Sequence, residues 1–400
     1  MTHERPLRVL VLVHRQLDNS PYCFFVHDQV KALRALGHDV QVISPVGTLP
    51  FYGRLRPEAA AVVRATPRRT VVEGVPVYYP RFPALGDAGE RLLGGGPEAR
   101  AAMRTAQRLH KDKPFDILHA HMLDRDGHAG RFIAGKLGVP LVLTVHGTDV
   151  FRYFGKGRMP SPRNVETVRS VDGLMAVSQK LLSLVAPYRE GGLSEVIPNG
   201  VDLSLVDPAP VNVPRSILSV GTLKARKCMG ATLDAFGAIA GDYPDARLTI
   251  VGVGEERGML KRRIDERGLS GRAILAGGVT HGEVMRMMAQ SDAFVLPSYD
   301  EGQGIVYIEA MASGCVAVGS LDEGISETIR DGENGFLVPA GDARAVERTL
   351  RRIFDAPDRL RSLRERARQD ALALSWAENT RRTQAFYRRA MGAAGKNRSK

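Results

Sequence analysis

Two glutamates, Glu301 and Glu309, stand on either side of a glycine-containing turn, and their type and spacing could do chemistry. The turn contains Gly302 and Gly304, which allow a tight bend and a close approach of the backbone to a ligand. If both glutamates lay on one helix, they would be about 12 Å apart along its axis. This separation argues against a paired-carboxylate hydrolase. It favours two separate hydrogen-bonding roles toward one polyhydroxylated, anionic ligand.

The residues on either side of this turn are typical of a strand and a helix. Residues 293–296 form a short apolar run that suits a buried parallel strand. Ile305, Ile308 and Met311 then recur at helical spacing. A turn of this kind presents unpaired backbone N–H groups at the start of a helix, where an anion is favoured.

The same alternation of apolar strands and helices runs along the whole chain. Residues 7–13 and 40–43 are expected strands on either side of a helix over 22–36, and the pattern starts again with a strand over 216–220. Four hundred residues are too many for one ordinary core. We therefore predict an α/β protein with two doubly wound, Rossmann-like domains that face a central cleft. Ligands would bind there, at the carboxyl ends of the strands.

A proline-rich stretch divides the two domains in this prediction. Residues 206–215 contain Pro208, Pro210 and Pro214 and are expected to be a linker. The N-terminal domain would then be 1–205 and the C-terminal domain 216–374. Residues 375–400 are expected to form a helix that packs back on the N-terminal domain, with a disordered end.

Composition limits the partners and the compartment. The net charge of +12 favours anionic partners, such as nucleotide phosphates, an acidic membrane surface or nucleic acid. The three cysteines are scattered in a pattern typical of neither a disulfide framework nor a metal site, which favours a reducing compartment. The apolar run near the start is too short for a signal peptide, and no run is long enough to span a membrane. We expect a cytoplasmic protein, with any membrane contact peripheral.

Several motifs of the chain resemble those of one enzyme family. Residues 301–314 resemble the E-x7-E motif of the retaining GT-B glycosyltransferases of family 4, also called glycosyltransferase group 1. Residues 146–149 (HGTD), residues 198–202 (PNGVD), the Arg226-Lys227 loop and residues 331–336 (DGENGF) fall in the order of the family's other motifs. The resemblance spans nearly the whole chain and implies the GT-B fold.

The resemblance implies a nucleotide-sugar donor that is held mainly by the C-terminal domain. Glu309 would bind the ribose hydroxyls and Glu301 the hydroxyls of the transferred sugar, because a carboxylate can accept from two hydroxyls at once. The alternative for Glu309 is an ordinary surface position on the helix. Gln303 replaces the phenylalanine usual in the family, and we expect its amide to lie beside the sugar site. The predicted donor-binding residues are Gly302, Gln303, Gly304, Ile305, Val306, Glu309, Gly221, Gly252 and Gly254.

Arg226 and Lys227 match the basic pair that binds the diphosphate in this family. Arginine can bind phosphate in a bidentate way and lysine acts as a point charge, so both would stabilise charge on a departing diphosphate. The chain has Thr222 where many family members have an arginine after the glycine that matches Gly221. The alternative is that Arg226 and Lys227 are two solvated basic residues.

Two histidines follow expected strands of the N-terminal domain. His121, in a loop after a strand over 116–119, matches the family histidine that contacts the transferred sugar; a structural role is the alternative. His146 and Asp149 follow the next strand and are predicted on the acceptor side, where Asp149 either binds acceptor or orients His146. Asn19 lies in a first loop that lacks the family's glycines, and it is also predicted on the acceptor side. The predicted catalytic residues are His121, Lys227, Arg226 and Glu301.

A basic region and the lack of metal motifs complete the predicted partners. Residues 54–113 contain twelve Lys or Arg and six Asp or Glu, a local excess of six positive charges. Together with residues 49–52 (LPFY), they predict either a membrane-facing patch for a lipid-linked acceptor or a solvated basic surface. We expect no essential metal and no cofactor, because the nucleotide sugar is a substrate.

The sequence thus predicts a glycosyltransferase that moves a sugar, with retention, from a nucleotide-diphosphate donor to a glycan or lipid-linked acceptor. The product would belong to cell-surface polysaccharide or glycolipid synthesis. Two alternatives stay open: a nucleotide-sugar epimerase on the same fold, and a non-catalytic nucleotide-sugar-binding subunit. Nucleic-acid binding is not expected, because the basic residues are not interleaved with aromatic residues and no known nucleic-acid-binding module is recognised.

Overall fold

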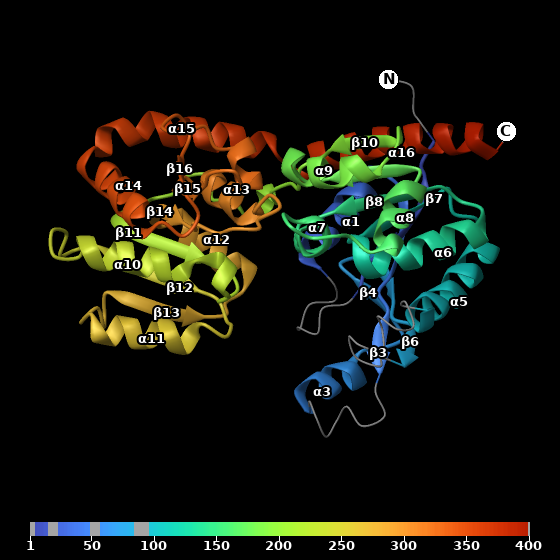
Figure 1. Ribbon diagram of the computed structural model, residues 1–400, viewed down its shortest axis with the longest axis horizontal. Coiled ribbons are helices and arrows are strands. Elements are labelled where there is room, and N and C mark those ends of the chain that lie inside the picture. The colour runs from blue at the N-terminus through green and yellow to red at the C-terminus, as the bar shows by residue number, and fades with distance from the viewer. Residues whose placement is uncertain (1–4, 15–22, 49–56, 84–95, 399–400) are drawn as a thin grey trace. The chain divides into compact units, whose positions relative to one another are not determined.

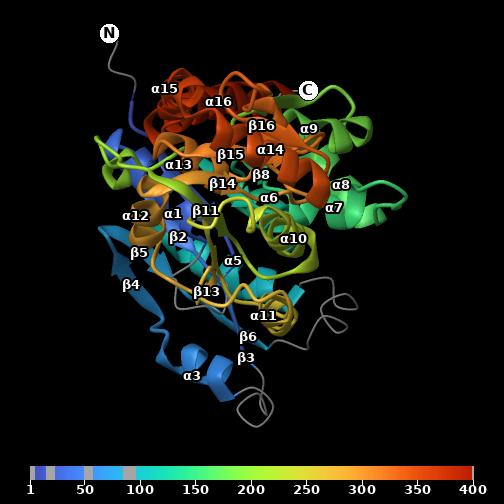
Figure 2. The same cartoon turned by 90° about the vertical axis from the view of Figure 1, so that its left-hand side faces the viewer.

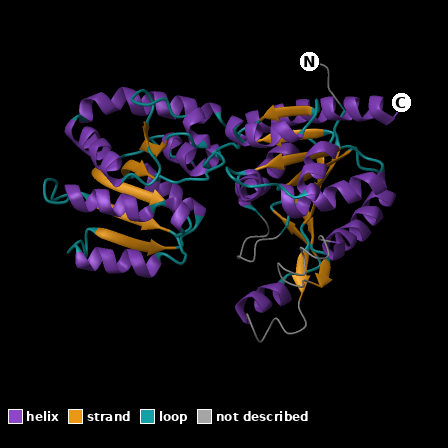
Figure 3. Cartoon of the chain, in the orientation of Figure 1, coloured by secondary structure: helices purple, strands orange, loops and turns teal. Residues whose placement is uncertain are grey.

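A computed structural model describes residues 5–14, 23–48, 57–83 and 96–398, and the chain divides into two compact units. Unit 1 comprises Met1–Pro198 and Trp376–Lys400, and unit 2 comprises Asn199–Ser375. Each unit is a sheet of mostly parallel strands with helices on both faces, as Figures 1 and 3 show. The last helix of the chain, red in Figure 1, belongs to unit 1.

The units do not divide at the expected linker over 206–215. The N–H of Val213 donates to the carbonyl of Gln290 (2.9 Å), and the Asn212 side-chain amide donates to the carbonyl of Ser291 (2.6 Å). These bonds make the segment part of the second sheet, whose first strand begins at Val213. The chain instead leaves unit 1 after Pro198 and returns to it at Trp376.

Unit 1 contains an eight-stranded sheet of order β10-β9-β8-β7-β1-β2-β5-β4, parallel except for the β4–β5 hairpin. Its strands are β1 (Arg8–Leu12), β2 (Asp39–Ile43), β4 (Arg69–Val72), β5 (Val75–Tyr78), β7 (Ile117–His121), β8 (Leu141–Val145), β9 (Gly173–Ala176) and β10 (Leu193–Val196). A separate pair is β3 (Val46–Thr48) and β6 (Arg81–Pro83). The helices are α1 (Phe24–Ala35), α3 (Pro57–Ala65), α5 (Gly96–Asp112), α6 (His128–Leu137), α7 (Thr148–Phe154), α8 (Pro162–Ser170), α9 (Gln179–Val185) and α16 (Trp376–Arg398).

The strand residues of unit 1 alternate between two apolar clusters. Leu10 and Leu12 face a cluster that includes residues of α5 and α6, whereas Val9 and Val11 face a cluster that includes residues of α1 and α16. Because helices cover both faces, both faces of the central strands can be apolar, which explains the continuous apolar run over Val9–Val13. Strand β7 extends to His121, beyond the expected end at residue 119, because it stays paired with β8 to that point.

Unit 2 contains a six-stranded sheet of order β13-β12-β11-β14-β15-β16. Its strands are β11 (Val213–Val220), β12 (Arg247–Val251), β13 (Ala273–Gly277), β14 (Ser291–Val295), β15 (Val316–Ser320) and β16 (Phe336–Val338). The helices are α10 (Met229–Ile239), α11 (Arg257–Glu266), α12 (His281–Ala289), α13 (Ile305–Ala312), α14 (Ala343–Asp355) and α15 (Pro357–Ala373). In Figure 2, α10 and α11 lie on one side of these strands and α12 on the other. All pairs are parallel, and one apolar cluster spans the unit.

The strand order of unit 2 locates its ligand site. With β11 counted as first, the order is 3-2-1-4-5-6, that of doubly wound nucleotide-binding sheets, and it reverses between β11 and β14. The loops that follow these two strands therefore start side by side at the carboxyl edge, where the parallel strands end. In such sheets, ligands bind at this switch point.

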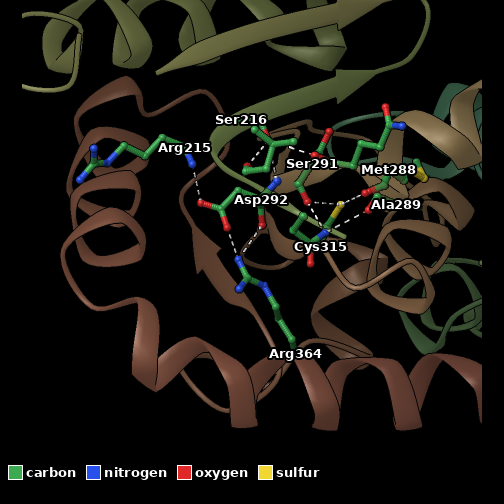
Figure 4. A network of polar contacts seen from close by, with 11 residues as sticks. Arg215, Ser216, Met288, Ala289, Ser291, Asp292, Cys315 and Arg364 are labelled. Carbon is green, nitrogen blue, oxygen red and sulfur yellow. Dashed lines mark hydrogen bonds and ion pairs between the residues drawn. The ribbon is translucent and has the colours of Figure 1, made fainter. Parts of the chain in front are cut away.

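The opposite edge of the same sheet is fixed by Asp292, at the start of β14 (Figure 4). Its carboxylate accepts from the N–H of Arg215 (2.9 Å) and contacts the Arg364 guanidinium of α15, while its own N–H donates to Ser216 Oγ (3.0 Å). Nearby, the buried Cys315 thiol donates to the carbonyl of Met288 (2.9 Å). These bonds tie β11, β14 and α15 together far from the carboxyl edge.

Glycines allow the loops after β11 and β12 to lie against each other. Gly252 has a φ of 145°, and a Cβ built there would lie 1.8 Å from the carbonyl oxygen of Gly221. Gly254 has a φ of 157°, and its Cβ would lie 2.4 Å from the carbonyl oxygen of Leu223. Glycine is thus required at both positions for the backbone approach alone.

We predict that Gly252→Ala destabilises unit 2 by roughly 2 kcal/mol or more, because the added Cβ meets backbone that cannot move aside cheaply. Urea unfolding followed by circular dichroism measures the change. Gly258→Ala in α11 is the matched control, since its Cβ would meet only the far end of Arg262, and it should stabilise by about 0.5 kcal/mol. Equal stability of the Gly252 variant and the wild type would contradict this account.

Candidate active site

Glu301 joins the two loops at the switch point of unit 2. Its carboxylate contacts Lys227 Nζ and lies 3.8 Å from Arg226 Nη1. Lys227 is only 8% exposed. Because a buried charge is costly unless it is paired, this ion pair holds the loop after β11 against the loop after β14. The structure thus brings together three of the four predicted catalytic residues.

The loop after β15 fixes Glu301 from its backbone side. The N–H of Glu301 donates to Glu323 Oε2 (2.8 Å), and the N–H of Gly324 donates to the Glu301 carbonyl (3.1 Å). A Cβ on Gly324 would lie 1.7 Å from the carbonyl oxygen of Gly302, so only glycine fits there. Sequence analysis missed Glu323 and Gly324, because no local pattern reveals a contact across 22 positions.

The turn that follows Glu301 forms the N-terminus of α13. Gly304 caps the helix in a left-handed conformation, with a φ of 75°. The first N–H groups of a helix have no acceptor within it, so Ile305 and Val306 present donors at the carboxyl edge. A negatively charged ligand is favoured at such a helix start.

Gln303 joins the turn to the start of unit 2. Its Oε1 accepts from the N–H of Asn199 (2.8 Å), and its Nε2 donates to the Asn199 carbonyl (3.2 Å). The residue is 3% exposed. The predicted place of this amide beside the sugar site stays a prediction. Both ends of the amide are taken by the backbone of Asn199, at the start of unit 2.

Glu309 is buried inside α13 and is bound to a histidine. It is 4% exposed, which excludes an ordinary surface position, and its Oε1 lies 2.7 Å from His281 Nε2. His281 is the first residue of α12, where Thr280 and Glu283 form a capping box that fixes the helix start. Sequence analysis missed His281. The capping-box pattern could have marked the helix start, although not the direction of this side chain.

Three histidines gather toward the carboxyl edge of unit 1: His119 and His121 on β7, and His146 just after the neighbouring strand β8. His121 Nδ1 lies 3.0 Å from His146 Nε2, and the two rings stack with centroids 5.3 Å apart. His119 lies against His121, with ring centroids 4.0 Å apart. Both nitrogens of His119 are bound, to the Tyr387 hydroxyl (2.7 Å) and to Thr144 Oγ1 (2.6 Å), which agrees with its expected place in the core.

Burial keeps these histidines neutral. It lowers the pKa of His119 and of His146 to about 3. It also lowers the pKa of His121 well below its ordinary value, with help from the two neighbouring rings. A single hydrogen is therefore shared between His121 Nδ1 and His146 Nε2, and its position sets the tautomer of both rings. Within the described part of the chain, the buried atoms His121 Nε2 and His146 Nδ1 have no hydrogen-bond partner.

Asp149 binds backbone. Its carboxylate accepts from the N–H groups of Leu123 (2.9 Å), Gly147 (2.8 Å) and His146 (3.3 Å), and the residue is 8% exposed. Of the two alternatives for Asp149, these bonds favour the one in which it orients His146, and acceptor binding stays a prediction. Asp149 orients His146 through the main chain and ties the loop after β7 to the loop after β8.

A charged pair lies at the switch point of unit 1, where β1 and β7 are neighbours. His14 follows β1, and its Nδ1 lies 2.8 Å from Oδ2 of Asp126, in the π-helical turn Leu123–Gly127. Burial alone would lower the pKa of His14, but the charge and hydrogen bond of Asp126 raise it to about 9. The raised pKa keeps the His14 imidazole protonated at neutral pH, beside a carboxyl of Asp126 whose own pKa is raised by burial. Asn19, the third predicted acceptor-side residue, lies outside the described residues.

Two further searches of the described residues gave no candidate. No group of three or more His, Cys, Asp or Glu side chains there is arranged to hold a metal ion. No helix in those ranges combines the length and the apolar character that crossing a membrane requires.

Comparison with known proteins assigns both units to related sequence families. Residues 24–205 match Glycosyltransferase Family 4, and residues 203–370 match Glycosyl transferases group 1. A glycogen synthase of Mycobacterium tuberculosis is 29% identical over 372 residues, covering 86% of both chains. TuaC of Bacillus subtilis, a glycosyltransferase assigned to teichuronic acid biosynthesis, is 29% identical over 306 residues, covering 72% of this chain and 74% of its own.

A solved structure extends the similarity to the fold. Alr3699/HepE of Anabaena, in complex with UDP and glucose, superposes with a TM-score of 0.70 and 17% sequence identity, covering 95% of this chain and 98% of its own. Two doubly wound units in one chain are the GT-B architecture, so the fold prediction is confirmed.

We predict that the free energy of unfolding of unit 1 falls toward acid pH and falls again toward alkaline pH. These two parts of its pH profile are called the acid limb and the alkaline limb. The lowered pKa values of His119 and His146 mean that the unfolded state binds more protons below about pH 6.5, so stability falls with pH from there. The raised pKa of His14 adds stability that is present below about pH 6.5 and is lost as pH rises through about 9. Urea titrations read by Trp376, the single tryptophan and a residue of unit 1, measure both limbs.

Two variants separate these contributions. His14→Gln should cost about 2 kcal/mol at pH 6 and should flatten the alkaline limb, whereas His146→Asn should flatten the acid limb. An alkaline limb of unchanged slope in His14→Gln would show that the ion pair with Asp126 does not contribute to stability.

Proposed function

Since the chain belongs to the group 1 glycosyltransferases, we propose that it transfers a sugar from a nucleotide-diphosphate donor to a glycan or lipid-linked acceptor, with retention of configuration. We place this reaction in cell-surface polysaccharide or glycolipid synthesis. The observation that carries the proposal is the pair of Glu301 and Lys227 at the switch point of unit 2. The Glu301 carboxylate can accept hydrogen bonds from sugar hydroxyls, and the Lys227 cation beside it can bind phosphate.

In this proposal unit 2 holds the donor. Lys227 and Arg226 bind the diphosphate, together with the first N–H groups of α13, while Glu301 takes hydroxyls of the sugar and Glu309 those of the ribose. The glycine loops after β11 and β12 bring backbone close to the nucleotide. The UDP and glucose bound to the similar HepE support a nucleotide-sugar donor. The glycogen synthase and TuaC similarities support a glycan or cell-surface product.

The chemistry assigned to the chain follows from these charges. The bond from the anomeric carbon to the phosphate oxygen breaks, the bond to the acceptor oxygen forms on the same face, and the acceptor proton passes to the leaving phosphate. Lys227 and Arg226 stabilise the negative charge that develops on the diphosphate. His121 and His146 are neutral, so they supply hydrogen bonds to hydroxyls without adding charge to the reaction centre.

The function is tested with a panel of UDP-, GDP- and ADP-sugars. We expect one donor to raise the apparent melting temperature, because it binds the folded state. Nucleotide diphosphate should then be released only with an acceptor from a set of oligosaccharides and lipid-linked sugars, and the product should keep the donor's anomeric configuration by NMR. Acceptor-independent turnover of the donor would favour an epimerase, and an inverted product would overturn retention.

We predict that Lys227→Ala lowers kcat by roughly 100-fold or more, because it removes the cation that stabilises the leaving diphosphate. Lys224→Ala is the matched control: Lys224 lies in the same loop but is exposed, and among the described residues no ion pair links it to Glu301. Initial rates of nucleotide diphosphate release give both values. A Lys227 variant within threefold of the wild type would remove this residue from the site.

We also propose that α5 gives unit 1 a peripheral contact with an anionic membrane surface. Arg100, Arg104, Arg108 and Lys111 recur at helical spacing and are all exposed. They span about 16 Å of the helix, and no carboxylate of the described residues forms an ion pair with them. The expected residues 49–52 of this patch lie outside the described residues. A basic stripe of this kind is attracted to anionic lipids by about 1 kcal/mol per charge.

Co-sedimentation with lipid vesicles tests this contact. We expect binding to vesicles that contain phosphatidylglycerol, little binding to phosphatidylcholine alone, and a loss of roughly tenfold or more in Arg104→Glu/Arg108→Glu. The control Arg344→Glu/Arg348→Glu makes the same change on exposed positions of α14 in unit 2. Equal losses in both double variants would indicate a net-charge effect and not a contact through α5.

A further inference from the structure

We propose that His281 is a positioning residue for donor recognition, which holds Glu309 so that one carboxylate oxygen faces the ribose hydroxyls of the nucleotide. The inference rests on the proposed function, because it takes Glu309 as the residue that binds the ribose. His281 lies 28 positions before Glu309, on the preceding helix.

The contact leaves the two oxygens of Glu309 with different tasks. Oε1 lies 2.7 Å from His281 Nε2, and no other hydrogen bond to this carboxylate is found within the described residues. Glu309 is 4% exposed, so its charged side chain needs a fixed partner, and His281 supplies it. An ionised carboxylate has about four acceptor positions, so Oε2 keeps the capacity to accept from two adjacent hydroxyls.

Both ends of the contact are anchored in regular structure. The capping box of Thr280 and Glu283 fixes the first turn of α12, where His281 is the first residue. On the other side, Ile308 and Ala310 are fully buried and fix the rotation of α13. The orientation of the Glu309 carboxylate is therefore set by two rigid helices and does not depend on a loop.

The loop before α12 lies where the nucleotide is expected. A Cβ on Gly278, just after β13, would lie 3.5 Å from Val253 Cγ1. This places the β13 loop against the loop of Gly252 and Gly254, two predicted donor-binding residues. The loop after β13 leads into His281, so it contributes to nucleotide recognition indirectly, through the contact of His281 with Glu309.

A purely structural tie between α12 and α13 makes a different prediction from a positioning role. Loss of a structural tie would weaken every nucleotide alike, through a looser site. Loss of positioning would weaken only nucleotides that have the hydroxyls that Glu309 binds. The ratio of affinities for a ribonucleotide and its deoxy analogue separates the two.

We predict the affinities that calorimetry measures for UDP, 2′-deoxy-UDP and 3′-deoxy-UDP. If the donor panel selects another base, the corresponding nucleotides replace them. The wild type prefers the ribonucleotide. His281→Ala binds the ribonucleotide about 10-fold more weakly and the deoxy analogues almost unchanged, because a hydrogen bond to a charged group is worth about 1.5 kcal/mol. His281→Gln restores part of the preference, since its amide offers an N–H near the position of Nε2.

Two control variants make the result decisive. Arg286→Ala changes an exposed residue of α12 and keeps both the capping box and the His281–Glu309 contact, so it should leave the ribose preference intact. Glu309→Gln should itself remove the preference. If Glu309→Gln changes neither affinity nor preference, the ribose role in the proposed function fails. If Glu309→Gln removes the preference while His281→Ala keeps it, or loses all nucleotides equally, only the positioning role of His281 is overturned.

Discussion

The ion pair of Glu301 and Lys227 is the contact on which the carboxyl edge of unit 2 depends. The glutamate side chain binds the loop after β11, and its backbone is bound by Glu323 and Gly324 of the loop after β15. Three loops therefore meet at one residue. Because each charge would be costly to bury alone, neither Glu301 nor Lys227 can be replaced without disturbing its partner. These contacts fix separate loops at the edge where the parallel strands end.

The two units arrange charge in opposite ways. Unit 2 concentrates cations, a helix N-terminus and paired carboxylates, which suits an anionic ligand that also has hydroxyl groups. Unit 1 presents the neutral pair of His121 and His146, and its charged pair of His14 and Asp126 is compensated internally. Such a surface can bind hydroxyls while adding no net charge. The division agrees with a donor that brings its own negative charge and an acceptor that must lose only a proton.

Much of the architecture could be predicted, because it follows from local patterns of apolar residues in the sequence. The continuous apolar strands and the periodic helices gave two doubly wound units, and the glycine turn before α13 was recognisable from its composition. Glu301, Arg226 and Lys227 were placed in one site by their resemblance to the glycosyltransferase motifs, and the structure joins them at the switch point of unit 2. The order of these motifs along the chain is something that a sequence shows directly.

The contacts that could not be predicted all join distant residues through side-chain direction. The Gln303 amide is hydrogen-bonded to the backbone of Asn199, and the Asp149 carboxylate accepts from three backbone N–H groups. His281 reaches Glu309 from another helix. A sequence reveals that such residues are polar, but not which way they point. Residues placed in a site by spacing alone therefore divided into those that face the ligand edge and those that hold the scaffold.

The return of the chain to unit 1 at Trp376 determines the order in which the protein can be completed during synthesis. Phe386 and Tyr387 of α16 fill the apolar cluster on one face of the first sheet, and Gly173 leaves room for the Phe386 ring. The ribosome makes these residues only after the whole of unit 2. The first unit to emerge is thus the last to be finished, and its uncovered apolar face must be kept from aggregating for the time that about 180 further residues take to be translated.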